Sequence, residues 1–218
     1  VTKEGAALYT KADGRLKARA AELGGDVRAD GTLTIETDDT LTAKNVTAGG
    51  AATLTAGTTL NAQNVKSDNG AATLTAGTDL TAQNVTAGKD VALKAGKNLS
   101  VHDVTAGGNA NLTAGHDAAI DGAVTTGGDL KARVGNDLTV NGTVLSHGMT
   151  QIDAEHDAKF NGSLTSDKNL TIRAKNNIVT KEGAALYTKA DGHLKAHRAE
   201  LGGDVRADGT LTIETDDT

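Results

Sequence analysis

Short segments in which apolar and polar residues alternate recur along this chain. Within residues 41–60 they are Leu41-Thr42-Ala43, Val46-Thr47-Ala48 and Ala52-Thr53-Leu54-Thr55-Ala56. Alternation with a period of two places Leu, Val and Ala on one face and Thr on the other, as in a half-buried β-strand. An α-helix is disfavoured because its apolar residues would recur every 3.6 positions. The pattern therefore predicts an all-β protein built from short strands.

The segments themselves recur every 19 or 20 residues, so their apolar positions form three columns. The first column is Leu41, Leu60, Leu80, Leu99, Ala118, Leu138, Ala158 and Ile178. The second is Val46, Val65, Val85, Val104, Val124, Val144 and Leu164, and the third is Ile35, Leu54, Leu74, Leu93, Leu112, Ala132, Ile152 and Ile172. Such a period is typical of solenoids. We expect a right-handed parallel β-helix of about eleven rungs with three short strands per rung.

Gly and Asn separate the segments, and both tolerate positive φ, so we expect corners with left-handed backbone at these positions. The corner residues Asn45, Asn64 and Asn84 are one period apart and are expected to hydrogen-bond along the axis as a ladder. Asp121-Gly122 and Asn141-Gly142 predict tight turns in the later rungs.

The repeat indicates one solenoid over residues 1–218, with regular rungs at 41–178. Residues 1–40 and 179–218 are near-identical copies that differ at three positions: Arg15 against His193, Arg19 against His197, and Ala20 against Arg198. Residues 20–23 fit either a strand or a short helix. Since the second copy stops just before the point where regular rungs follow the first, we expect a segment of a longer array. Its uncapped ends would favour end-to-end self-association.

Composition narrows the function classes. Proline is absent, which suits ladders that need every N–H, and cysteine is absent, which excludes disulfides and thiolate metal sites. The net charge of −6 argues against nucleic-acid or anionic-membrane binding, and we expect no membrane insertion. Six histidines form no evident ligand cluster, so no metal or other cofactor is expected.

The recurring strings LTAG, NVTAGG and GGDL, without Pro or Cys, resemble the haemagglutinin repeats of the filamentous haemagglutinin family. The resemblance implies a β-helical rod of a secreted adhesin, exported by two-partner secretion through an outer-membrane transport partner and displayed on the bacterial cell surface. It implies a virulence function in which the rod projects binding elements and mediates attachment to host cells. The shaft of a contact-dependent inhibition toxin is an alternative within the same class.

A β-helix enzyme that degrades polysaccharide is the alternative from another class. Acidic pairs such as Asp38-Asp39 could supply carboxylates for glycoside cleavage. Such enzymes usually also use aromatic platforms and long loops, whereas aromatic residues are 1% of this chain. We therefore expect that the chain is not an enzyme.

A basic stripe is the one candidate binding site that the sequence suggests. Arg15, Lys17 and Arg19 alternate with apolar residues and are expected to point outward from one strand, where they could bind sulfated glycans of host cells. The second copy offers Lys195 and Arg198 at the matching place, together with His193 and His197. Because histidine gains a proton in mild acid, this copy should bind anions less strongly at neutral pH and more strongly below about pH 6.

Overall fold

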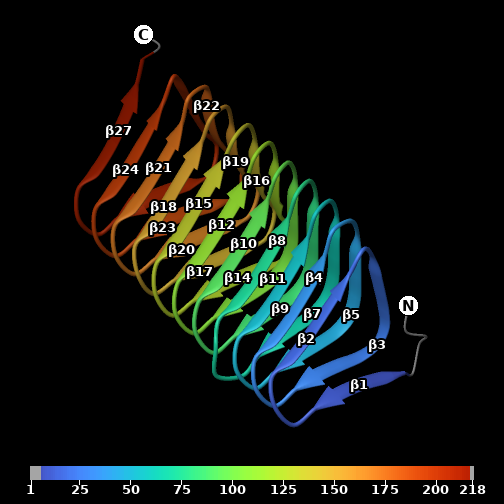
Figure 1. Ribbon diagram of the computed structural model, residues 1–218. Helices are drawn as coiled ribbons and strands as arrows, with labels where there is room; N and C mark the ends of the chain where they lie inside the picture. The colour runs from blue at the N-terminus through green and yellow to red at the C-terminus, as the bar shows by residue number, and fades with distance from the viewer. Residues whose placement is uncertain (1–5, 217–218) are drawn as a thin grey trace.

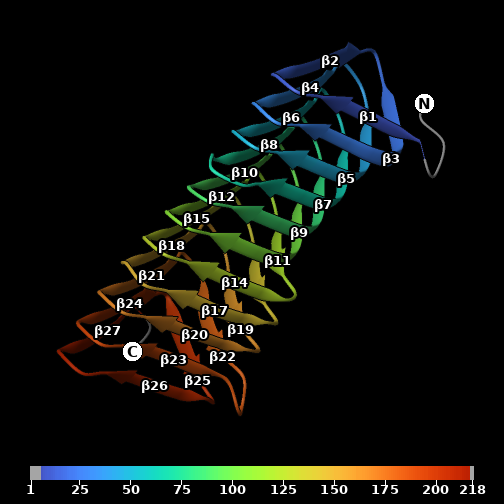
Figure 2. The same cartoon turned by 90° about the horizontal axis from the view of Figure 1, so that it is seen from below.

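The computed structural model describes residues 6–216, which form strands, turns and bends but no helix. The chain winds into a rod of stacked rungs from one end to the other (Figure 1). All strand pairs are parallel, and two sheets run the length of the rod (Figure 2). The predicted β-solenoid is confirmed. Residues 21–29 form a strand, so the helical alternative near residue 20 is wrong.

Sheet B has 11 strands, one from each rung. They are β2 (Gly14–Ala18), β4 (Leu33–Thr37), β6 (Ala52–Ala56), β8 (Ala72–Ala76), β10 (Val91–Ala95), β12 (Ala110–Ala114), β15 (Leu130–Val134), β18 (Thr150–Ala154), β21 (Leu170–Ala174), β24 (Gly192–Ala196) and β27 (Leu211–Thr215). At about 4.8 Å between neighbouring strands, this sheet makes a rod roughly 50 Å long.

Sheet A supplies the remaining 16 strands. The N-terminal rungs contribute β1 (Ala7–Thr10), β3 (Ala21–Ala29), β5 (Leu41–Ala48), β7 (Leu60–Ser67), β9 (Leu80–Ala87) and β11 (Leu99–Ala106). The later rungs contribute β13 (Ala118–Ile120), β14 (Ala123–Thr126), β16 (Leu138–Val140), β17 (Thr143–Ser146), β19 (Ala158–Phe160), β20 (Ser163–Ser166), β22 (Asn177–Thr180), β23 (Ala185–Thr188), β25 (Arg198–Leu201) and β26 (Asp204–Ala207).

The three apolar columns have the predicted register. Leu41 pairs with Leu60, Val46 with Val65, and Leu54 with Leu74. Leu41, Leu54, Leu60 and Leu74 are all fully buried. Thr and charged residues between them point outward, as the alternation requires. The core is thus a narrow column of mainly aliphatic side chains along the axis, which also includes Phe160.

Three strands per rung is correct only for the later rungs. In the earlier ones the first two segments join into one continuous strand, such as β5, in which the adjacent residues Lys44 and Asn45 both point outward at a bend. Pairing continues through the bend, because Asn45 stays in register with Asn64. From β13 onward, Asp121-Gly122 and its successors interrupt the strand and split it in two.

The corners need glycine because the backbones of successive rungs approach closely there, and not because the backbone is left-handed. Among residues 6–216 positive φ occurs only at Gly183, at 84°, so the expectation for the Asn and Gly corners is wrong. A Cβ on Gly142 would lie 1.7 Å from the carbonyl oxygen of Gly122, and one on Gly77 would lie 1.9 Å from that of Gly57. Stacked corners leave no space there for a side chain, since the rungs are only about 4.8 Å apart.

The predicted asparagine ladder is confirmed. Asn45 Nδ2 donates to Asp26 Oδ1 over 2.7 Å, and Asn64 and Asn84 each donate to the preceding Asn over 2.8 Å. Each bend in this part of the rod is therefore joined to the next by side chains as well as by backbone.

The end strand β27 has no further strand beside it within the described residues. Its Leu211 and Ile213 are 37% and 42% exposed, although they continue buried rows of sheet B. Residues 1–5, 217 and 218 lie outside the described part, and end-to-end association of the chain stays a prediction.

Substitution of a column residue by a charged one should unfold neighbouring rungs. Leu74→Asp should lower the free energy of unfolding by at least about 2–5 kcal/mol, the cost of losing a buried Leu side chain, before any cost of burying the carboxylate is added. Thr75→Asp, whose side chain points outward, is the control and should change stability by less than about 0.5 kcal/mol. Urea denaturation followed by circular dichroism measures both, and equal stability of the two variants would contradict the column assignment.

Candidate functional site

Basic side chains gather on the outer face of sheet B. Strands β10–β24 present five basic side chains on this face against one acidic residue; these are Lys94, Lys131, Arg133, Arg173 and Lys195, with Asp153. Strand alternation and register place them there, because each lies between two inward-facing residues. This local excess of positive charge contrasts with the net charge of −6.

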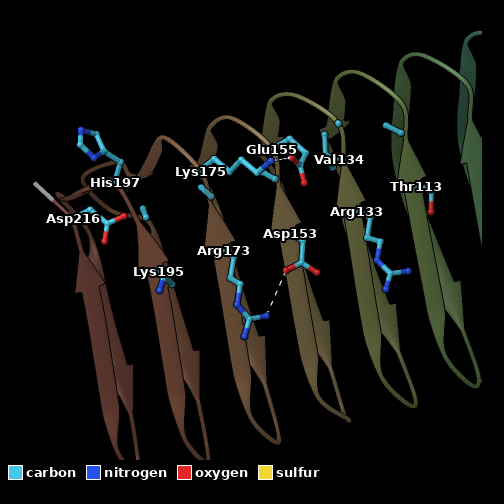
Figure 3. A pocket seen from close by; sticks show the side chains of 15 residues that line it. Thr113, Arg133, Val134, Asp153, Glu155, Arg173, Lys175, Lys195, His197 and Asp216 are labelled. Carbon is cyan, nitrogen blue, oxygen red and sulfur yellow. Dashed lines mark ion pairs between the residues drawn. The ribbon is translucent and has the colours of Figure 1, made fainter.

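A groove of about 610 Å³ lies between this face and the turns that follow its strands. In Figure 3, Arg133, Asp153, Arg173 and Lys195 come from successive strands and lie in one row, with Lys175 and Glu155 at the turns. Arg173 Nη1 lies 3.6 Å from Asp153 Oδ1, and Lys175 forms an ion pair with Glu155. Within residues 6–216 the side chain of Arg133 has neither an ion pair nor a hydrogen bond, so its guanidinium is available to an anion.

Toward its C-terminal end the groove has acidic as well as basic side chains around it. His197 and Asp216 line it there, and Glu214 lies beside Lys195. Lys195 Nζ is 3.2 Å from Glu214 Oε2, and this hydrogen bond is the main cause that lowers the pKa of the Glu214 carboxyl; nearby His193 adds to the effect. Glu214 is therefore a carboxylate at any pH near neutrality.

The structure divides the stripe that the sequence suggested. Arg15 and Lys17 lie on the outer face of β2, with Arg19 in the following turn, and Arg15 Nη2 is 3.0 Å from Glu36 Oε2. Lys195 lies on β24, nine strand spacings away, or roughly 43 Å at about 4.8 Å each. Arg198 belongs to β25 in sheet A, where it pairs with Glu200 at 3.2 Å.

Sequence reasoning missed a cluster of Asp137, His156 and Asp157, whose ligand atoms lie within 4.8 Å of one another. His156 Nδ1 is 2.6 Å from Asp137 Oδ1, and the buried Asp157 accepts hydrogen bonds from Asn176 and Asn177. Asp137 Oδ1 and Asp157 Oδ1 therefore already accept hydrogen bonds from the protein itself. The cluster therefore works as a side-chain ladder at the corner between the sheets. Its only signal in the sequence was the separation of 19 residues between Asp137 and His156, which equals one rung.

Stability should depend on pH through His156. Its hydrogen bond to Asp137 raises the pKa of His156, so protonated His156 favours the folded state. That contribution is complete below the ordinary histidine pKa of about 6.5 and is lost as the pH rises through the raised value. His156→Gln should lower the Tm below pH 6 and leave it near that of the parent chain above pH 8.

The control for this experiment is His197→Gln, because His197 makes no ion pair among residues 6–216. Thermal melts from pH 5 to pH 9 give the two Tm profiles. Parallel profiles for the parent chain and His156→Gln would show that the Asp137 contact contributes nothing to folding.

Fold and surface together define a fibrous β-solenoid shaft, with a uniform interior and a charged outer face. Models of the haemagglutinin repeat match residues 15–144 and 161–217 of the chain. The chain therefore belongs to the haemagglutinin-repeat family and forms an adhesin-type shaft. Neither the curated proteins nor the solved structures gave a match. No helix that could span a membrane occurs in the described part of the chain.

Proposed function

We propose that this chain is part of the rod of a secreted bacterial surface adhesin, which projects binding elements from the cell and mediates attachment to host cells. The observation that carries this proposal is the unbroken, in-register stacking of 11 strands in sheet B. A stack held by backbone hydrogen bonds at every rung resists bending, so it keeps its two ends a fixed distance apart. That property suits a spacer between a cell surface and a receptor.

Secretion through an outer-membrane transport partner agrees with the composition. A chain without cysteine cannot be trapped by disulfides in the oxidising periplasm and can cross the outer membrane unfolded. The parallel ladder then forms outside the cell, where each new rung stacks on the preceding one. The shaft of a contact-dependent toxin would need the same rod, and neighbouring sequence would distinguish the two.

The rod itself also contributes to attachment through the outer face of sheet B. Surface glycans of host cells carry sulfates, which guanidinium and ammonium groups bind by charge-assisted hydrogen bonds. Arg15, Lys17 and Arg19 offer such groups at one end, and Arg133 offers an unpaired guanidinium nearer the other.

Beads coated with the purified chain should attach to cultured epithelial cells, and a soluble sulfated polysaccharide should reduce attachment. The triple variant Arg15→Ser, Lys17→Ser, Arg19→Ser should attach severalfold less, since each exposed charge contact contributes up to about 1 kcal/mol. The matched control removes three lysines from other surfaces: Lys66→Ser, Lys89→Ser, Lys97→Ser.

The attachment proposal is wrong if beads with the parent chain bind cells no better than uncoated beads. If both triple variants lose attachment equally, net charge rather than the outer face of sheet B is responsible.

A further inference from the structure

One corner of the rod contains one residue more than its counterparts in the other described rungs. In those rungs three residues join the last strand of sheet A to the strand of sheet B that follows, such as 49–51 after β5 and 88–90 after β9. Between β7 and β8 the chain uses four, residues 68–71. The strands on either side stay in register with their neighbours, so the extra residue is accommodated within the corner itself.

The extra residue leaves a backbone N–H group without a partner. Asn69 N–H donates to Gly49 carbonyl oxygen over 3.1 Å, as the ladder between rungs requires. The next carbonyl oxygen of that rung, on Gly50, accepts from Ser67 Oγ over 2.6 Å instead. Among residues 6–216, no acceptor bonds the N–H group of Gly70. This nitrogen is therefore free at a corner where the ladder holds its neighbours.

A free backbone nitrogen directly after an asparagine can react with that side chain. When the nitrogen of Gly70 attacks Cγ of Asn69, a five-membered succinimide ring forms, and the side-chain NH₂ leaves as ammonia with the proton of the Gly70 N–H group. Water then opens the ring at either of its two carbonyl carbons, which gives aspartate or isoaspartate. Glycine favours ring closure because it has no side chain that hinders the approach and the fewest restrictions on its backbone.

The chain contains two other Asn-Gly pairs, Asn141-Gly142 and Asn161-Gly162, and in both the ladder holds the glycine nitrogen. Gly142 N–H donates to Ile120 carbonyl oxygen and Gly162 N–H donates to that of Val140, both over 3.2 Å. Each pair also lies directly between two strands of sheet A, so ring closure would distort paired backbone on both sides.

The side chains of these two asparagines are held as well. Asn141 Nδ2 donates to Asp121 Oδ1, and Asn161 Nδ2 donates to Asn141 Oδ1, both over 2.7 Å. Asn69 Nδ2 makes one longer bond, of 3.1 Å, to Gly49 carbonyl oxygen. All three asparagines are exposed, so hydrogen bonding rather than exposure distinguishes them.

We propose that Asn69 is a site of spontaneous deamidation, at which the shaft modifies its own backbone with water as the only co-reactant. In the folded rod it converts faster than Asn141 and Asn161, because only its following nitrogen is free. The modification is thus confined to one corner of a ladder that protects the same dipeptide elsewhere.

The product changes this corner in two ways. Either form adds one negative charge beside Asp68, whose Oδ1 lies 2.6 Å from Lys66 Nζ. The isoaspartate form also lengthens the backbone of the corner by one atom. Gly70 already packs against the preceding rung, where an added Cβ would lie 2.5 Å from Ala51 nitrogen, so the longer corner must bulge outward. The ladders of the flanking strands need not move.

Peptide mapping by mass spectrometry tests the proposal with the full 218-residue chain, incubated at pH 7.5 and body temperature and sampled over several weeks. Digestion in mild acid, where ring closure is slow, prevents reaction during sample preparation. Asn69 should convert about fivefold or more faster than Asn141 or Asn161, because ring closure at the latter two must also break the hydrogen bond of the glycine N–H group. An isoaspartate-specific methyltransferase should label the product at position 69.

The same chain unfolded in guanidinium chloride is the control, since all three pairs then lose their hydrogen bonds and should convert at similar rates. Asn69→Gln keeps the amide but requires a less favourable six-membered ring. This variant should not convert at the corner, whereas Asn141 and Asn161 should convert as in the parent chain. The proposal is overturned if Asn69 converts no faster than the other two in the folded rod, if the difference persists in guanidinium chloride, or if aspartate forms without isoaspartate.

Discussion

Parallel hydrogen bonding between successive rungs is the constraint on which the rest of this structure depends. A rung of about 20 residues cannot bury enough apolar surface to hold itself together, so each rung is stable only against its neighbours. The bonding continues through the corners, where Gly49 N–H donates to Ala29 carbonyl oxygen over 2.9 Å and Gly57 N–H donates to that of Thr37 over the same distance. Proline has no place in such a stack, and a corner glycine is required wherever a Cβ would meet the preceding carbonyl.

The same constraint fixes the volume available inside each rung. The first and third residues of β5, Leu41 and Ala43, both face the core, and β7 and β9 repeat this large and small pair. Where the first position becomes small, the other becomes large: Ala158 is followed two residues later by the fully buried Phe160. The strands at these positions pair in register, so the exchange conserves core volume without shifting the backbone.

Inward positions could be predicted from the sequence because a single rule governs them. Leu54 and Leu74 occupy identical environments, and one period of 20 residues places both. The corners were less predictable, since a glycine needed for close approach looks the same in a sequence as a glycine needed for positive φ. The fused strand at Lys44-Asn45 was also hidden, because a bend that keeps its ladder pairing leaves no mark on the apolar pattern.

The candidate site was predicted less well from the sequence than the fold was. Contacts such as Arg173 with Asp153 join outward residues one period apart, and the same register arithmetic, applied to outward positions, would have found them. The proposed stripe included Arg198, which directly follows His197 in the sequence. The chain, however, turns the corner at that point, so Arg198 enters sheet A.

Freedom at the outward positions explains how one rod can carry different surfaces. Strands β6 and β8 present uncharged side chains such as Thr53 and Thr73, whereas the later strand β15 presents Lys131 and Arg133 over the same kind of core. Neither set disturbs the ladder, because outward side chains are not needed to build it. The duplicated unit shows the separation most directly, since Arg15 and His193 sit on equivalent strands and contact equivalent carboxylates. Selection can therefore alter charge along the shaft, position by position, while the interior stays fixed.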